Sequence, residues 1–145
     1  MKITSVNTYF VRPRWGCAVS ETDEGITGWG EAVLEGHAKA VLACVEEYRG
    51  YLIGADRADI EGIWSTIYRA GFYRGGGVLM SALSGIDQAL WDIKGKMANM
   101  PVYQMLGGKV REGADVYRHA DGKTIDEVEE NIQKFLDQGY RYVRV

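Results

Sequence analysis

The most regular pattern of apolar and polar positions lies between residues 79 and 97. Apolar side chains recur there at steps of four and three residues: Leu79, Leu83, Ile86, Leu90, Ile93 and Met97. This spacing places them on one side of an α-helix, and the other side carries Ser81, Ser84, Gln88 and Asp92. The glycines at 75–77 favour a flexible loop that leads into a core helix over 79–98. Anion binding at the start of this helix is the alternative interpretation.

The first 34 residues show the shorter period that is typical of β-strands. Runs of β-prone residues cover 3–11, 17–21 and 26–34, and Asp23-Glu24-Gly25 is typical of a turn. Together they predict a three-stranded antiparallel meander.

Helical spacing dominates the residues that follow this meander. It predicts a helix over 36–50, a second helix that runs from an N-cap at Asp56 to about residue 70, and a short helical turn opened by Pro101. Strands followed by a run of helices form an α+β pattern.

The pattern changes after residue 112. Residues 114–120 alternate as a strand, Thr124 to Glu127 form a capping box ahead of a helical period, and residues 140–145 alternate again. These elements predict a β–α–β unit whose two strands are parallel. We therefore expect two domains, 1–112 and 113–145.

Composition excludes several classes of protein. The 145 residues carry a net charge of −3, which argues against a nucleic-acid surface. No apolar run is long enough to span a bilayer, and the N-terminus does not have the pattern of a signal peptide. Cys17 and Cys44 stand apart without metal-site spacing, so we expect reduced thiols in a cytoplasmic protein. The acidic residues occupy predicted turns and helix starts, and we predict no metal site.

Three segments carry a family resemblance: YRAGFYRGG at 68–76, SALSGIDQALWDIKGK at 81–96 and PVYQMLGGKVRE at 101–112. They resemble the N-terminal capping domain of the enolase superfamily, in its mandelate racemase/muconate lactonizing branch. Within that branch the likeness is to acid-sugar dehydratases of the galactonate and mannonate type. The resemblance implies a capping domain over the mouth of a (β/α) barrel, with residues 113–145 as the incomplete start of that barrel. We expect the chain to be part of a longer enzyme and to be inactive by itself.

The resemblance also implies a reaction. Enzymes of this family remove the proton α to a carboxylate, and Mg²⁺ stabilises the charge of the resulting enediolate. Loss of water then gives a 2-keto-3-deoxy acid. The magnesium ligands come from the third, fourth and fifth barrel strands, so we expect none in this chain. A racemase or epimerase, or a non-catalytic capping or assembly module, is the alternative function.

Two residues near the C-terminus match barrel positions of the family. Arg144, in the run YRYVR, takes the first basic position of a K-x-K type motif that supplies an acid–base residue. His119, in VYRHADG, resembles a histidine that faces the substrate in mannonate dehydratase-like members. The alternatives are a surface ion pair for Arg144 and an ordinary loop or core position for His119.

Substrate-binding residues are expected in three segments of the cap. Arg14 and Trp15 form a carboxylate-binding lip or, alternatively, a solvated loop with one packed ring. Glu35 and His37 resemble the galactonate-type pattern, in which a basic residue takes the place of His37; mannonate-type members have Asn where Glu35 stands. The alternative for Glu35 is an acid at a helix start. Tyr73 and Arg74 belong to the aromatic-basic cluster ahead of the glycines, and Arg74 alternatively pairs with a neighbouring acid.

The expected partners follow from the same resemblance. They are a sugar-acid substrate, the remaining barrel polypeptide and further copies of the chain in a homo-oligomer, with no nucleic acid and no membrane.

Overall fold

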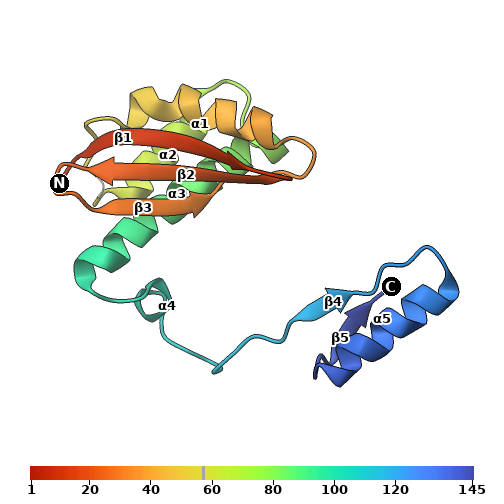
Figure 1. The fold of residues 1–145 in the computed structure, drawn as a ribbon. Helices are drawn as coiled ribbons and strands as arrows, with labels where there is room; N and C mark the ends of the chain where they lie inside the picture. The colour runs from red at the N-terminus through yellow and green to blue at the C-terminus, as the bar shows by residue number, and fades with distance from the viewer. Residues whose placement is uncertain (57) are drawn as a thin grey trace. The chain divides into compact units, whose positions relative to one another are not determined.

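The computed structural model describes residues 1–56 and 58–145. They form two compact units, Met1–Gly108 and Lys109–Val145, which we describe separately (Figure 1). The domain boundary predicted after residue 112 lies a few residues beyond this division and stays a prediction.

The first unit contains the predicted antiparallel meander. Strands β1 (Ile3–Val11), β2 (Trp15–Thr22) and β3 (Thr27–Glu31) are hydrogen-bonded in the order β1-β2-β3. The third strand was predicted to reach residue 34, which is wrong. The chain leaves the sheet earlier because it turns into the first helix, where the His37 amide donates to the Leu34 carbonyl at 2.8 Å.

Four helices follow in the first unit (Figure 1): α1 (Ala38–Leu52), α2 (Ile60–Ala70), α3 (Gly77–Ala98) and the short α4 (Val102–Met105). Helices α1 and α3 contact the strands, and α2 packs against both helices. The antiparallel sheet with its helices confirms the predicted α+β cap.

The N-cap of α2 corrects a prediction. Asp59, not Asp56, caps this helix, and its Oδ1 accepts the Gly62 amide at 3.1 Å. Asp56 instead accepts the Ala58 amide at 3.0 Å in the preceding turn. Both aspartates precede an apolar period, so sequence spacing alone did not separate them.

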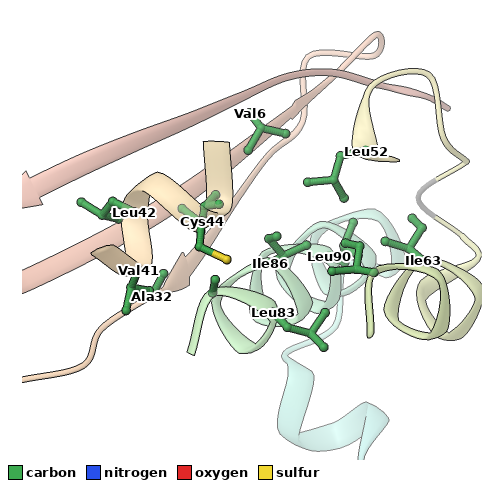
Figure 2. Close-up of a cluster of buried hydrophobic side chains, with 14 of the residues drawn as sticks. Val6, Ala32, Val41, Leu42, Cys44, Leu52, Ile63, Leu83, Ile86 and Leu90 are labelled. Atoms are coloured by element: carbon green, nitrogen blue, oxygen red, sulfur yellow. The ribbon is translucent and has the colours of Figure 1, made fainter. Parts of the chain in front are cut away.

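The core lies between the sheet and the helices, and Figure 2 shows its side chains converging from strands and helices. The apolar stripe of α3 supplies its central members, Leu83, Ile86, Leu90 and Ile93, which are all buried. Met97, at the last turn of that stripe, is 41 % exposed. The period therefore identified the buried face of α3 correctly, but not where its packing ends.

Glycines bring α3 into direct contact with β3. A Cβ atom at Gly28 would overlap the Ala89 carbonyl, and one at Gly30 would overlap the Gly85 carbonyl. Only glycine permits a strand and a helix backbone to approach this closely.

The polar side of α3 also has a partner in the sheet. Gln88 Oε1 accepts the Glu31 amide at 3.0 Å, and Asp92 Oδ2 accepts the Trp29 amide at 2.9 Å. One turn later, Lys96 Nζ donates to the Thr27 carbonyl at 2.7 Å. These side chains occupy the outer edge of β3, which would otherwise offer unpaired backbone groups.

The second unit is the predicted β–α–β unit. It comprises β4 (Tyr117–His119), α5 (Ile125–Asp137) and β5 (Tyr142–Arg144), and the two strands are parallel. Thr124 caps α5 as predicted, because its Oγ1 accepts the Glu127 amide at 3.3 Å. Both strands are shorter than predicted. Each pairs with one neighbouring strand only, and this pairing extends over three residues.

No helix in residues 1–56 and 58–145 is both long and apolar enough to cross a membrane.

Candidate functional site

An ion pair joins two of the predicted cap segments. Arg14 lies in the turn between β1 and β2, and Glu35 lies between β3 and α1. Arg14 Nη1 is 2.7 Å from Glu35 Oε1. Pairing of β3 with β2 brings the two segments together, because the Ala32 amide donates to the Gly16 carbonyl at 2.8 Å beside them. The sheet register thus places Arg14 and Glu35 in contact although 21 positions separate them in the sequence.

A hollow of about 300 Å³ opens beside this ion pair. Its walls come from the hairpin and from the first turn of α1: Phe10, Pro13, Arg14, Gly36, His37, Ala38, Lys39 and Ala40. His37 is the N-cap residue of α1, and its side chain makes no capping hydrogen bond. No acidic residue occupies the first turn of that helix. The hollow therefore combines basic side chains with the positive end of a helix dipole, a combination suited to oxygen-rich ligands.

Trp15 completes this lip at the first position of β2. Its ring is 43 % exposed, and the Arg14 guanidinium carbon lies 5.5 Å from the ring centroid. A cation–π contact of this kind restrains a long side chain that is otherwise half in solvent. Arg14 is thus held from two sides, by a ring and by a carboxylate.

Tyr73 and Arg74 lie elsewhere, in the loop between α2 and α3. They line a second hollow of about 260 Å³, which shares no lining residue with the hollow at Arg14. The ring of Tyr73 is 85 % exposed and makes an edge contact with Phe72, with centroids 5.4 Å apart. The predicted substrate-binding residues of the cap thus line two separate hollows, and their role in binding stays a prediction.

Sequence reasoning did not anticipate the tyrosines of this second hollow. Tyr48 and Tyr51 of α1 and Tyr68 of α2 form its rim. The one signal was the three-residue step from Tyr48 to Tyr51, which places two rings on the same side of a helix.

Tyr48, which lines this hollow, and its neighbour Cys44 both have raised pKa values. Burial raises the pKa of Tyr48, and its hydrogen bond with Cys44 raises the pKa further. Burial also raises the pKa of the Cys44 thiol. Both groups are therefore protonated at neutral pH and form a structural pair rather than a reactive thiolate.

The second unit brings the two predicted barrel residues together. His119 and Arg144 are register partners in the parallel pair β4–β5. Arg118, between His119 and Tyr117, points to the opposite side, where its guanidinium carbon lies 4.8 Å from the centroid of the Phe135 ring on α5. Side chains alternate along a strand, so His119 and Arg144 share the face turned away from α5. The rings of Tyr117 and His119 lie on that face with centroids 5.1 Å apart.

No group of three or more His, Cys, Asp or Glu side chains within residues 1–56 and 58–145 is arranged to hold a metal ion. Two of the carboxylates already have other partners: Asp92 accepts a backbone amide, and Glu35 pairs with Arg14. These residues do not fit the octahedral oxygen cage that magnesium requires.

Comparison with known proteins gives consistent matches over the whole chain. Residues 18–107 match the N-terminal domain of mandelate racemase / muconate lactonizing enzyme. A D-galactonate dehydratase of Verminephrobacter eiseniae is 52 % identical over 145 residues, which is 100 % of this chain and 38 % of that protein. A D-galactonate dehydratase of Pectobacterium atrosepticum is 55 % identical over 140 residues, or 97 % of this chain and 37 % of that protein.

A solved structure shows the same fold. The crystal structure of an enolase from Pantoea ananatis with bound D-gluconate and Mg is 43 % identical and superposes with a TM-score of 0.90. The match covers 99 % of this chain and 36 % of that one. The chain thus spans less than two fifths of the length of the relatives that it matches.

Proposed function

The chain belongs to the mandelate racemase/muconate lactonizing enzyme family, and from this membership we propose that it serves in a magnesium-dependent dehydratase of sugar acids. The D-galactonate dehydratase relatives and the structural neighbour solved with D-gluconate and Mg support this substrate class. In the proposed reaction the proton α to the carboxylate is removed, the β-hydroxyl leaves as water, and the resulting enol becomes a 2-keto-3-deoxy acid.

The register of His119 with Arg144 is the observation that carries the proposal. Two adjacent parallel strands present a titratable ring and a permanent cation side by side, on the face that is turned away from the helix. In a (β/α) barrel that face is the interior, and residues at the ends of its strands contact substrate.

The two residues have different proposed roles. His119 forms a hydrogen bond with a substrate oxygen or transfers a proton to or from it, since imidazole both donates and accepts hydrogen bonds. Arg144 keeps a fixed positive charge beside the proton-transfer site, which stabilises the deprotonated form of a neighbouring base.

Arg14, Trp15, Glu35 and His37 have a proposed binding role. The hydroxyl-rich end of a sugar acid offers both donors and acceptors, and the paired guanidinium and carboxylate of Arg14 and Glu35 match them. Tyr73 and Arg74, which line the other hollow, belong to a separate proposed contact.

Magnesium, when bound to the complete enzyme, would stabilise the negative charge that develops on the substrate carboxylate. The residues described by the structure, 1–56 and 58–145, include no group that fits the ion, so we propose that its ligands come from the rest of the enzyme. A cytoplasmic homo-oligomer completes the proposal.

The test is product analysis with the complete enzyme that contains this chain. It is incubated with Mg²⁺ and a panel of sugar acids, and semicarbazide detects the 2-keto-3-deoxy product. We expect product from at least one hexonate. Epimerised substrate without keto acid would replace the dehydratase by the epimerase, and no conversion of any acid would favour the non-catalytic module.

A further inference from the structure

The Arg14–Glu35 ion pair changes what the lip offers to a ligand. An arginine with a free guanidinium fork binds a carboxylate through two parallel hydrogen bonds. In this protein the Nη1 atom of Arg14 already contacts Glu35 Oε1 at 2.7 Å, and the guanidinium rests against the Trp15 ring. The fork is therefore partly occupied before any substrate arrives.

Glu35 also supplies the negative charge beside this hollow. The residues that line it include Arg14, His37 and Lys39 but no acid. Without Glu35 the lip would be strongly cationic and would attract a carboxylate. With Glu35 in place, a donor and an acceptor stand side by side, which is the pattern that a hydroxyl group satisfies because it donates and accepts at once.

We infer that Glu35 is a specificity-determining residue that admits sugar acids ending in hydroxyl groups and rejects those with a second carboxylate. The inference rests on the proposed function and deepens it, because it concerns the end of the substrate that does not react. A second carboxylate would lie next to the Glu35 carboxylate and would compete with it for Arg14. A terminal primary alcohol or a vicinal diol would bridge the two side chains instead.

The solvent exposure of the two side chains sets the expected change in substrate affinity. The Arg14 and Glu35 side chains are 56 % and 72 % exposed, so water and salt screen their charges. Repulsion between like charges a few ångströms apart at such a surface changes a binding constant on the order of tenfold.

The experiment uses the complete enzyme and a matched pair of acids, D-gluconate and D-glucarate, which differ at the terminal carbon. Glu35→Gln removes the charge of residue 35 and keeps its length and its hydrogen-bond acceptor for Arg14. We expect the ratio of kcat/KM for glucarate to kcat/KM for gluconate to rise about tenfold, and this rise to shrink at high ionic strength. Glu24→Gln makes the same charge change in the turn between β2 and β3, at the other end of β2 from Arg14, and should leave the ratio unchanged.

Calorimetric binding of both acids to the wild type and to Glu35→Gln gives a readout that does not depend on turnover. Gluconate should bind the wild type more tightly than glucarate, and Glu35→Gln should narrow the difference. Two results would overturn the role of Glu35 and leave the dehydratase proposal intact. One is that Glu35→Gln changes neither the kcat/KM ratio nor the difference in affinity between the two acids. The other is a wild type that accepts glucarate as well as gluconate. If the enzyme converts neither acid but still binds gluconate more tightly than glucarate, the proposed reaction is wrong and the role of Glu35 is supported.

Discussion

Asp92 on α3 accepts the backbone amide of Trp29 on β3, with 2.9 Å between Oδ2 and N. The same Oδ2 is 2.7 Å from Lys96 Nζ. A helix side chain thus takes the place of a fourth strand at the edge of the sheet, and a neighbouring cation holds it there. This arrangement protects the edge from pairing with another chain.

Asp92→Ala should lower the free energy of unfolding by about 1 kcal/mol, the usual net value of one hydrogen bond to a partly exposed group. Asp92→Asn keeps an acceptor for the Trp29 amide and is the matched control, with a smaller expected loss. Urea denaturation followed by circular dichroism measures both. Equal stability of Asp92→Ala and the wild type would contradict a structural role for this contact.

Gly30→Ala should be more damaging than Asp92→Ala. Its Cβ would overlap the Gly85 carbonyl, so α3 must move away from β3 or the strand must bend. Overpacking of this kind costs about 1–3 kcal/mol or more. Gly50→Ala on α1 is the control, because a Cβ there meets nothing within 4 Å and alanine favours a helix. We expect thermal unfolding to shift down for Gly30→Ala and slightly up for Gly50→Ala; the same sign for both would rule out the backbone contact as the cause.

Tyr48 and Cys44 should make the fold sensitive to alkali. Burial raises the pKa values of both groups above their ordinary values of 10.0 and 9.0, so the folded state holds both protons more tightly than the unfolded state does. Their contribution to stability is present below pH 9 and is lost as the pH rises through the ordinary values toward the raised ones. Denaturation at pH 8 and at pH 10.5 should show this loss. Tyr48→Phe should reduce it, and the exposed Tyr51→Phe on the same helix should retain it.

Arg144→Ala in the complete enzyme should lower kcat by about two orders of magnitude, the scale of an acid–base contribution. The fold should survive, because Arg144 lies at the end of a three-residue strand. Arg141→Ala is the matched control, since Arg141 is exposed and precedes that strand. Steady-state kinetics measures kcat, and circular dichroism checks the fold. An unchanged kcat would mean that Arg144 is a surface cation without a catalytic role.

Hydrogen exchange should separate the two units of the 145-residue chain. Helix α3 contributes many buried residues, whereas α5 buries only Phe135 among its described residues and the strands β4 and β5 each have one neighbour. We expect amides of β4 and β5 to exchange much faster than those of α3, unless copies of the chain associate and cover them. Sedimentation velocity distinguishes these outcomes. A monodisperse monomer with equal protection in both units would show that residues 109–145 are stable without further strands.

Local pattern was sufficient for much of this fold. The step of four and three residues identified α3 and its buried face, since an α-helix repeats every 3.6 residues whatever its neighbours are. Thr124 and Glu127 predicted the start of α5, because a capping box is completed within four positions. Family likeness in local segments likewise led to His119 and Arg144.

The tertiary structure decided what depends on distant residues. The choice between Asp59 and Asp56 as N-cap, the end of β3 at Glu31 and the binding of Asp92 to the sheet edge each depend on where a neighbouring element lies. Arg14 has a partner because the sheet register brings Glu35 to it. Tyr73 lines a different hollow, because its loop joins α2 to α3 and not two strands of the sheet. Sequence spacing specifies the period of one element, whereas contacts between elements follow from the packing of the whole unit, and no local pattern contains that information.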